Sequence, residues 1–148
     1  MENFKVYKIL SRNDTGETNS HQSGMSVPKE IARSGIFPML GTESLNPRTE
    51  VDFYDEQNIK WTFQYIYYND AFFGKERGKG HDEYRLTCIK EFLRSNNVKS
   101  GDSIWFFIDN NGIRHVGIKK QEEELSLDNT ETKITIGSNS SWVFVKIK

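Results

Sequence analysis

The chain has 148 residues, a length that suits one domain built around a single core. Lys and Arg number 20 and Asp and Glu number 21, so a formal net charge of -1 excludes both a uniformly basic nucleic-acid coat and a strongly acidic disordered chain. Aromatic residues make up 13% of the sequence, which favours a β-rich domain because aromatic rings pack well on pleated sheets.

The N-terminal part predicts a strand, a long polar loop and a short helix. Residues 4–10 form the first strand candidate, with partial apolar alternation. Residues 11–24 contain no aliphatic side chain, and loops of this length in compact domains are usually functional or disordered. Pro28 then occupies the first position of a short helix that reaches about Ser34, before Gly35.

A β-hairpin is predicted next, with arms at 50–54 and 59–68 around the turn 55–58. The second arm is rich in aromatic and β-branched residues, and one of its faces carries Trp61, Phe63, Tyr65 and Tyr67. A second irregular polar segment, 69–82, contains Gly74, Gly78 and Gly80.

A short strand at 84–86 leads into a helix, Cys88 to Ser95, which we expect Thr87 to cap. The helix has a single buried face, and Cys88 at its start is interpreted as a small core residue. A hairpin with strands 104–108 and 113–118 follows, where Asn111-Gly112 supplies positive φ.

The C-terminal part begins with an acidic segment, 121–131, which holds five acidic residues and no basic one. The rest of the chain contains 20 basic and 16 acidic residues, so a localised basic surface is compatible with the near-neutral total charge. A weak strand near 134–136 and a final strand at 142–147 bring the expectation to about seven strands and two short helices. These elements suit a small, mostly antiparallel barrel or sandwich.

Counting excludes several other classes of protein. Cys88 is the single cysteine, so neither an intrachain disulfide nor a Cys-based structural zinc site can form. No apolar run is long enough for a membrane span, and the N-terminus lacks the apolar core of a signal peptide. We therefore expect a soluble protein of a reducing cytoplasm with no membrane partner.

The first polar loop has side chains that suit the edges of bases. Arg12 offers a planar donor fork, Asn13 and Gln22 offer paired donors and acceptors, and Asp14 accepts when ionised. His21 and Thr15 add further polar groups. Arg suits guanine, Asn and Gln suit adenine and Asp suits the cytosine amino group in a major groove. An ordinary solvated loop with a turn at Asn13–Gly16 remains the structural alternative.

The second polar loop has side chains that suit phosphates. Lys75, Arg77, Lys79 and Arg85 lie on a glycine-flanked segment with His81 between them. Asp82 and Glu83 inside this basic loop indicate either acceptors for cytosine or groups that orient Arg85. The structural alternative is a surface network of ion pairs.

Two alternatives belong to other functional classes. A small metal-dependent nuclease would use carboxylates and a lysine from Glu50, Asp52, Asp55, Glu56 and Lys60, although strand alternation already explains these as a solvent face. An aromatic-rich ligand-binding module would use Trp61, Tyr65 and Tyr67 as a platform, although core packing explains these rings better. A thiol pair of Cys88 with His81 or His115 is the weakest reading of the cysteine.

The two polar loops together resemble one family. The run Leu10–Thr18, followed by His21-Gln22, Gly24 and Pro28, resembles the N-arm of the EcoRII-type N-terminal effector domain of restriction endonucleases. Its C-arm region resembles Ile66–Asn69, Phe73–Lys75 and Asp82–Thr87, and Asn46-Pro47 also fits. The shared order covers roughly residues 8–90, and nothing about a generic β-barrel requires the ordered Asn-Asp-Thr-Gly-x-Thr-x-x-His-Gln run.

This resemblance implies a B3-like, seven-stranded open β-barrel, or pseudobarrel, whose two arms grip the major groove of a short specific duplex site. The N-arm, residues 12–24, would use Arg12, Asn13, Asp14, Thr15, His21 and Gln22. The C-arm, residues 75–85, would use Lys75, Arg77, Lys79, His81, Asp82, Glu83, Tyr84 and Arg85, with Asn69 as a possible phosphate contact. The C-arm departs from the family at Gly78–His81, so either Arg77 or His81 takes the arginine role.

The same resemblance implies that residues 1–148 are one recognition domain from the N-terminal part of a longer, type IIE-like restriction endonuclease. The partners would be duplex DNA and a C-terminal nuclease domain of the same polypeptide. DNA binding would need no cofactor, and Mg²⁺ would be required only by the separate nuclease domain. No catalytic or metal site is expected in this chain.

Overall fold

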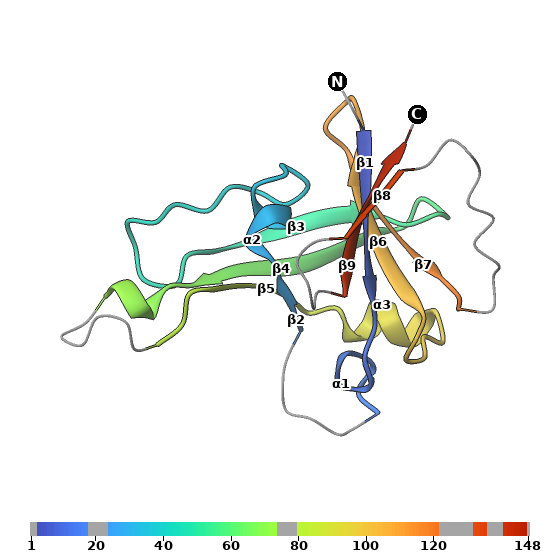
Figure 1. The fold of residues 1–148 in the computed structure, drawn as a ribbon, viewed down its shortest axis with the longest axis horizontal. Coiled ribbons are helices and arrows are strands. Elements are labelled where there is room, and N and C mark those ends of the chain that lie inside the picture. Colours follow the sequence, from blue (N-terminus) through green and yellow to red (C-terminus); the bar gives the residue numbers. More distant parts are fainter. Residues whose placement is uncertain (1–2, 18–23, 74–79, 122–131, 136–140, 148) are drawn as a thin grey trace.

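The computed structural model describes residues 3–17, 24–73, 80–121, 132–135 and 141–147 (Figure 1). In chain order its elements are β1 (Asn3–Ile9), α1 (Arg12–Thr15), β2 (Met25–Val27), α2 (Lys29–Ala32), β3 (Arg48–Tyr54), β4 (Lys60–Tyr68), η1 (Asp70–Phe72), β5 (Glu83–Thr87), α3 (Lys90–Ser95), β6 (Ser103–Ile108), β7 (Arg114–Lys119), β8 (Thr132–Thr135) and β9 (Trp142–Ile147).

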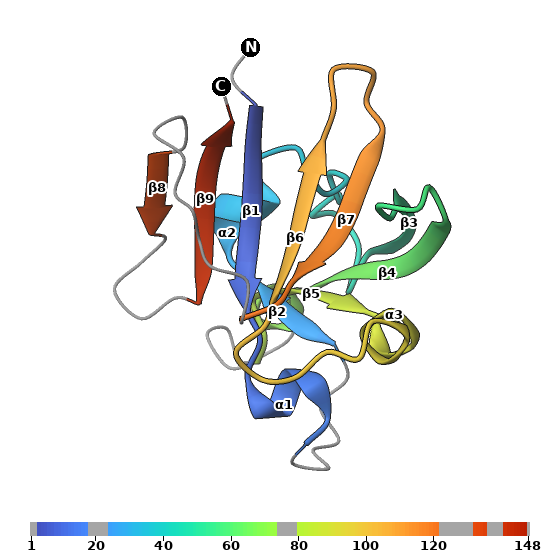
Figure 2. The same cartoon turned by 90° about the vertical axis from the view of Figure 1, so that its right-hand side faces the viewer.

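The strands form one curled sheet in the order β2-β5-β4-β3-β7-β6-β1-β9-β8 (Figure 2). Every recorded strand pair is antiparallel except β3 with β7, which run parallel where Tyr54 meets His115. The expected mainly β, open-barrel architecture is therefore confirmed. The described residues contain nine strands in place of about seven, because β2 was not predicted and the weak strand near 134–136 forms as β8.

The core lies inside the curled sheet, and its largest fully buried side chains are aromatic. Phe37 stacks on Tyr65 with ring centroids 5.0 Å apart, and both rings are almost fully buried. Phe106 meets Phe37 edge-on at 5.2 Å. Tyr65 and Tyr67 of β4 are 0% and 8% exposed, so these rings hold the barrel together and do not form a platform for a ligand.

Two helices differ from their predicted starts. Pro28 occupies the N-cap position of α2 and not its first turn, because its ψ of 153° is extended. Helix α3 begins at Lys90, since Thr87 is still in β5 and donates to the Gln64 carbonyl across the sheet. The predicted cap and the predicted core position of Cys88 are both wrong: Cys88 is exposed and turns the chain with a φ of +64°.

The short helix α1 was not predicted either, because residues 11–24 were interpreted as a loop throughout. The hairpins fit their predicted spans, and Gly112 has a φ of +79° in the second turn. Among the described residues, no helix has the length and apolarity needed to cross a membrane. The acidic residues 122–131 lie outside the described part of the chain.

Candidate nucleic-acid interface

The N-arm begins as a helical turn held by a capping box. The Ser11 hydroxyl accepts the Asp14 N–H at 3.2 Å, and the Asp14 carboxylate accepts the Ser11 N–H at 2.9 Å. The same carboxylate forms an ion pair with Lys8 of β1, and both side chains are only 10% exposed. Asp14 therefore anchors the arm to the barrel, and its oxygens are occupied by protein donors.

The other predicted residues of this turn lie differently. Arg12 and Asn13 are exposed, and the Arg12 side chain is 71% accessible with Glu17 3.7 Å away. Thr15 donates its hydroxyl to the Arg12 carbonyl at 3.2 Å, which closes the turn. Arg12 and Asn13 are thus the exposed ones among the predicted N-arm contacts that the structure describes, while His21 and Gln22 lie outside the described residues.

The N-arm returns to the sheet at Gly24, directly before β2. Gly24 has a φ of +78°, and a Cβ built there would lie 2.1 Å from the Leu86 carbonyl oxygen. A side chain at this position would collide with the backbone of β5, so only glycine lets the arm end pack this closely. This is the close approach that the β2–β5 pairing requires.

Asp70 of η1, which precedes the C-arm, contacts His81 within it. The His81 ring Nδ1 lies 3.1 Å from Asp70 Oδ2, and the His81 N–H donates to the other carboxylate oxygen. Those hydrogen bonds lower the pKa of the Asp70 carboxyl below its ordinary value. The side chains are 64% and 42% exposed, so this contact closes the base of the C-arm at the surface.

A second contact at the C-arm base centres on Asp82. Its carboxylate accepts from Lys29 Nζ of α2 at 2.5 Å and from the Tyr67 hydroxyl at 2.7 Å. These two hydrogen bonds hold the pKa of Asp82 below its ordinary value. Burial, together with the bond to Asp82, raises the pKa of Tyr67 to about 12. Asp82 therefore ties the C-arm to both α2 and β4.

Tyr84 continues the aromatic core outward beneath the C-arm. Its ring stacks on Tyr67 with centroids 4.3 Å apart and on Tyr65 at 5.7 Å. Such stacking fixes the ring in the sheet. Tyr84 supports the strand that leaves the C-arm, and its ring face is covered by protein.

Glu83 and Arg85 form an ion pair on the same face of β5. Arg85 Nη1 lies 2.8 Å from Glu83 Oε1, and Arg85 Nη2 donates to the Gly24 carbonyl at 3.1 Å. Of the two roles that the sequence left open for Glu83, orienting Arg85 is the one that this geometry supports. The remaining predicted C-arm residues, Lys75, Arg77 and Lys79, lie outside the described residues.

Asn69 lies directly before η1, ahead of the C-arm, and faces inward. It is 1% exposed, its Nδ2 donates to the Ser44 carbonyl at 2.9 Å, and its Oδ1 accepts the Asn46 N–H at 2.8 Å. In this arrangement the side chain holds the 44–46 turn against η1 and is not accessible to a phosphate. This position corrects the predicted phosphate contact.

Sequence reasoning missed three residues that set the arms in place: Lys8, Lys29 and Asp70. One signal was available for the N-arm, because Ser11 followed three residues later by Asp14 matches a capping box. Lys29 meets Asp82 across 53 positions of chain and Asp70 meets His81 across 11, and neither spacing is a local sequence motif.

Features of the other functional classes find no support in the described residues. No group of three or more His, Cys, Asp or Glu side chains there is placed to hold a metal ion. Glu50 and Asp52 lie on the exposed face of β3, and Asp55 accepts the backbone N–H groups of Gln57 and Ile59 in its turn. The carboxylates that the nuclease interpretation would use therefore lie on an exposed strand face and in a turn, and they do not form a cluster.

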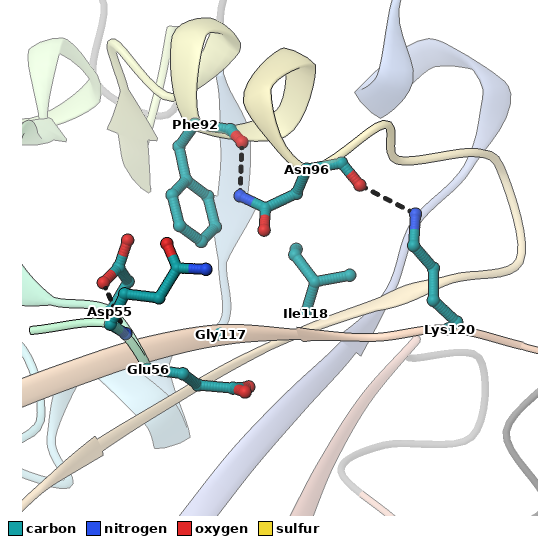
Figure 3. Close-up of a pocket in the computed structure, with 8 residues that line it drawn as sticks. Asp55, Glu56, Phe92, Asn96, Gly117, Ile118 and Lys120 are labelled. Atoms are coloured by element: carbon teal, nitrogen blue, oxygen red, sulfur yellow. Dashed lines mark hydrogen bonds between the residues drawn. The ribbon is translucent and has the colours of Figure 1, made fainter. Parts of the chain in front are cut away.

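One pocket of about 200 Å³ lies between the 55–57 turn, α3 and β7 (Figure 3). None of its lining residues belongs to either arm. Its polar groups are used within the protein: the Asn96 amide donates to the Phe92 carbonyl, and Lys120 donates to the Asn96 carbonyl. We therefore interpret the pocket as a gap in the packing of α3 against the barrel.

The described ends of the two arms lie on either side of the β2–β5 pair. In Figure 1, α1 lies at the bottom, the unlabelled green turn of η1 lies at the left, and β2 and β5 lie between them. β2 follows the N-arm, β5 contains the last residues of the C-arm, and the two strands pair antiparallel through Ser26 and Arg85. The two predicted contact segments thus flank one edge of the sheet.

Comparison with solved structures finds the same architecture in DNA complexes. The chain aligns with the structure titled "Arabidopsis FUS3-DNA complex" at a TM-score of 0.58 and 21% identity, covering 77% of this chain and 94% of that one. It aligns with the UbaLAI restriction endonuclease B3 domain, solved with cognate DNA, at a TM-score of 0.56 and 17% identity, covering 99% and 88%. These likenesses establish the B3-type fold.

Comparison of sequences reaches the family. Auxin response factor 10 of rice is 31% identical over 113 residues, which is 76% of this chain and 14% of that protein. The type II restriction enzyme EcoRII of Escherichia coli is 39% identical over 92 residues, which is 58% of this chain and 21% of that protein. This chain therefore spans between a seventh and about a fifth of the length of these relatives.

The family model described as "Restriction endonuclease EcoRII, N-terminal" matches residues 2–103, a span that includes β1, both arms and α3. The match covers more than half of the chain and agrees with the fold and with the arm motifs. The chain belongs to the family of EcoRII N-terminal domains.

Proposed function

We propose that this domain binds a short specific site in double-stranded DNA through the N-arm and the C-arm. The observation that carries the proposal is the family match over residues 2–103, because it spans both arms in order. The B3-type fold, found in two solved DNA complexes, supports it. The arms supply exposed base-reading groups, Arg12 and Asn13, on a turn that is fixed to the barrel.

The net charge of the chain shapes how this binding works. With a charge of -1 the domain lacks a large excess of basic residues, so bulk attraction to phosphates contributes less than in a basic DNA binder. Affinity then depends on the shape of two pre-set arms and on direct contacts to base edges. We expect binding to weaken less steeply with salt than it does for a strongly basic domain.

We also propose that the domain is the recognition and effector part of a type II, type IIE-like restriction endonuclease. Its membership in the EcoRII N-terminal family supports this, since EcoRII is a type II restriction enzyme of which the matched region is a fraction. A nuclease domain in the same polypeptide would supply the Mg²⁺-dependent chemistry in the prokaryotic cytoplasm. DNA recognition by this chain would need no metal.

A selection from randomised duplexes, followed by mobility-shift titration in EDTA, tests the first proposal. We expect one short motif to be enriched and to bind without metal. A variant that carries Arg12→Ala and Asn13→Ala should lose base preference. Arg94→Ala is the matched control, because it removes an exposed guanidinium from α3 and leaves both arms intact. No enriched motif, or equal binding of selected and scrambled duplexes, would remove the proposal.

The full-length polypeptide tests the second proposal. Cleavage of a plasmid should require Mg²⁺ and should respond to added duplex that carries the selected motif. The isolated domain should bind that duplex and cleave nothing. Mg²⁺-dependent cleavage by the isolated domain would instead favour the small-nuclease alternative.

A further inference from the structure

Glu17 follows α1 in the N-arm, and its carboxylate is held by a turn outside the arm. Its N–H donates to the Arg12 carbonyl at 2.9 Å, which closes the end of α1. Its Oε1 accepts the N–H of Ser100 at 3.3 Å. Ser100 belongs to the loop that joins α3 to β6, and Figure 2 shows this loop directly above α1. The position of the Glu17 carboxylate is therefore set by the barrel as well as by α1.

The turn that carries Ser100 is itself tied to the rest of the domain through Asp102, which is 5% exposed. The Asp102 carboxylate accepts the N–H groups of Lys99 and Gln121, each at 2.9 Å. The Asp102 carbonyl accepts the N–H of Leu10 at 2.8 Å, directly before the N-cap of α1. This turn is thus joined to the end of β7 and to the start of the N-arm, so it gives the Glu17 carboxylate a fixed support.

The second carboxylate oxygen of Glu17 faces Arg12. Glu17 Oε2 lies 3.7 Å from Arg12 Nε, and the two side chains are 37% and 71% exposed. An exposed pair at this separation adds little to folding stability. It does place a full negative charge beside a guanidinium that we propose as a base reader. The recorded contact uses Nε, whereas the guanidinium fork as a whole presents a pair of donors that matches O6 and N7 of guanine.

The charge of Glu17 acts differently on the two kinds of DNA group that Arg12 can meet. A phosphate carries a full negative charge, so a nearby carboxylate repels it. The acceptors on a guanine edge are uncharged, so the same carboxylate opposes them less. Non-specific complexes depend on phosphate contacts, whereas a specific site is read at the base edges. A carboxylate at this position therefore weakens binding to wrong sites more than binding to the right one.

We propose that Glu17 is a specificity-determining residue of the N-arm, whose carboxylate opposes contacts between Arg12 and phosphates and so lowers the affinity of the domain for non-cognate DNA. This inference rests on the proposed DNA-binding function and adds to it a residue outside the predicted contacts. Glu17 acts through its contacts with Arg12 and Ser100 and needs no contact with DNA of its own. Removal of its charge should strengthen DNA binding and reduce discrimination.

Glu17→Gln tests the proposal, because it removes the charge and keeps an oxygen that can accept the Ser100 N–H. Affinity is measured by mobility shift in EDTA at low salt, on the duplex selected from a random pool and on a scrambled duplex of equal length. We expect the variant to bind the scrambled duplex about 3- to 10-fold more tightly than wild type, and the selected duplex less than about 2-fold more tightly. The difference should shrink as salt is raised, since screening shortens the reach of the carboxylate.

Glu91→Gln is the matched control. Glu91 forms an exposed pair with Arg94 on α3 at 3.9 Å, so the substitution changes the net charge equally without altering either arm. Its affinity for the scrambled duplex should stay within about 2-fold of wild type. A second comparison places Glu17→Gln in an Arg12→Ala background. With no guanidinium beside it, the substitution should change binding to the scrambled duplex by less than about 2-fold.

Three results would overturn the inference: equal gains on both duplexes, the same gain in Glu91→Gln, or an undiminished gain in the Arg12→Ala background. Each would show a general repulsion of DNA and not an effect of the Glu17–Arg12 pair. Unchanged discrimination by Glu17→Gln, beside a wild type that discriminates, would overturn the inference and leave the proposed function in place. A wild type that binds both duplexes equally would remove the proposed function and the inference with it. If Glu17→Gln fails to fold in a thermal melt, Glu17→Ala replaces it with the same expected result.

Discussion

The bases of the two arms are closed by the same kind of contact in different surroundings. At the N-arm, Lys8 and Asp14 pair with both side chains 10% exposed, inside the end of the barrel. At the C-arm, Asp70 and His81 pair at the surface, and Asp82 meets Lys29 with both side chains partly accessible. Solvent and salt weaken exposed ion pairs, while a buried carboxylate cannot easily lose its partner.

This difference indicates a division of labour between the arms. The N-arm turn is set by a buried charge pair and a capping box before any ligand arrives. The C-arm is attached at Asp70, His81 and Asp82 by more exposed groups, so we expect salt to weaken these contacts more than the Lys8–Asp14 pair. Four substitutions test this contrast, and they are ordered from the largest expected effect to the smallest.

Asp14→Ala should have the largest effect on folding. It leaves the Lys8 ammonium buried without a carboxylate and removes the capping box, so we expect the free energy of unfolding to fall by about 3 kcal/mol. Urea denaturation measures the change. Lys8→Met combined with Asp14→Ala removes both charges and should recover part of the loss. A loss of unfolding free energy below about 1 kcal/mol for Asp14→Ala would mean that the Lys8–Asp14 pair stabilises the fold no more than an exposed ion pair does.

Asn69→Ala should lower the free energy of unfolding by about 2 kcal/mol. The substitution removes the side chain that bonds the Asn46 N–H and the Ser44 carbonyl. Urea denaturation measures this change in the free energy of unfolding. Since the side chain is 1% exposed, the slope of DNA affinity against salt concentration should stay at the wild-type value. If the slope of log affinity against log salt concentration fell by about one in the variant, Asn69 would be a phosphate contact after all.

Tyr67→Phe should cost about 1 kcal/mol at neutral pH, through loss of the hydrogen bond to Asp82. Its signature is the alkaline limb of the stability curve. Because the pKa of folded Tyr67 is raised to about 12, the folded state keeps a proton that the unfolded state releases from about pH 10 upward. Wild-type stability should therefore fall between about pH 10 and 12, and the variant should fall less steeply over that range. An identical slope in both proteins would contradict the assignment.

Asp70→Asn should have the smallest effect on folding at neutral pH, since the pair with His81 is exposed. The acid limb is more informative. The lowered pKa of Asp70 means that its contribution is present above its ordinary pKa of about 3.9 and is lost as the pH falls through the lower folded value. Calorimetry between pH 2 and 6 should show a shallower acid limb in the variant. A large loss at pH 7 would show that the C-arm base is held as firmly as the N-arm base.

Many of the strands and turns were predictable because local sequence patterns mark them. Alternation placed Phe63, Tyr65 and Tyr67 on the inward face of β4, and the Asn-Gly pair placed the turn between β6 and β7. Strand β2 was not predicted, because three residues are too few to show a period of two. Its pairing with β5 depends on residues about sixty positions away.

The candidate site was predictable as a set of segments and less so as a set of roles. Motif order marked the N-arm and the C-arm, but Asp14, Asn69 and Glu83 make protein contacts that composition does not reveal. The partner of Asp14, Lys8, lies on β1, and the partners of Asn69, Ser44 and Asn46, lie in a distant turn. Cys88 shows the same limit at a helix start, since its φ of +64° turns the side chain outward.

The most direct test of the central claim is a mobility-shift titration in EDTA with the duplex selected from a random pool and a scrambled duplex of equal length and composition. Recognition through two pre-set arms predicts that the isolated domain binds the selected duplex about 10³-fold more tightly, or better, without any metal. Equal affinity for the two duplexes, or no binding to either, would contradict sequence-specific recognition by this domain.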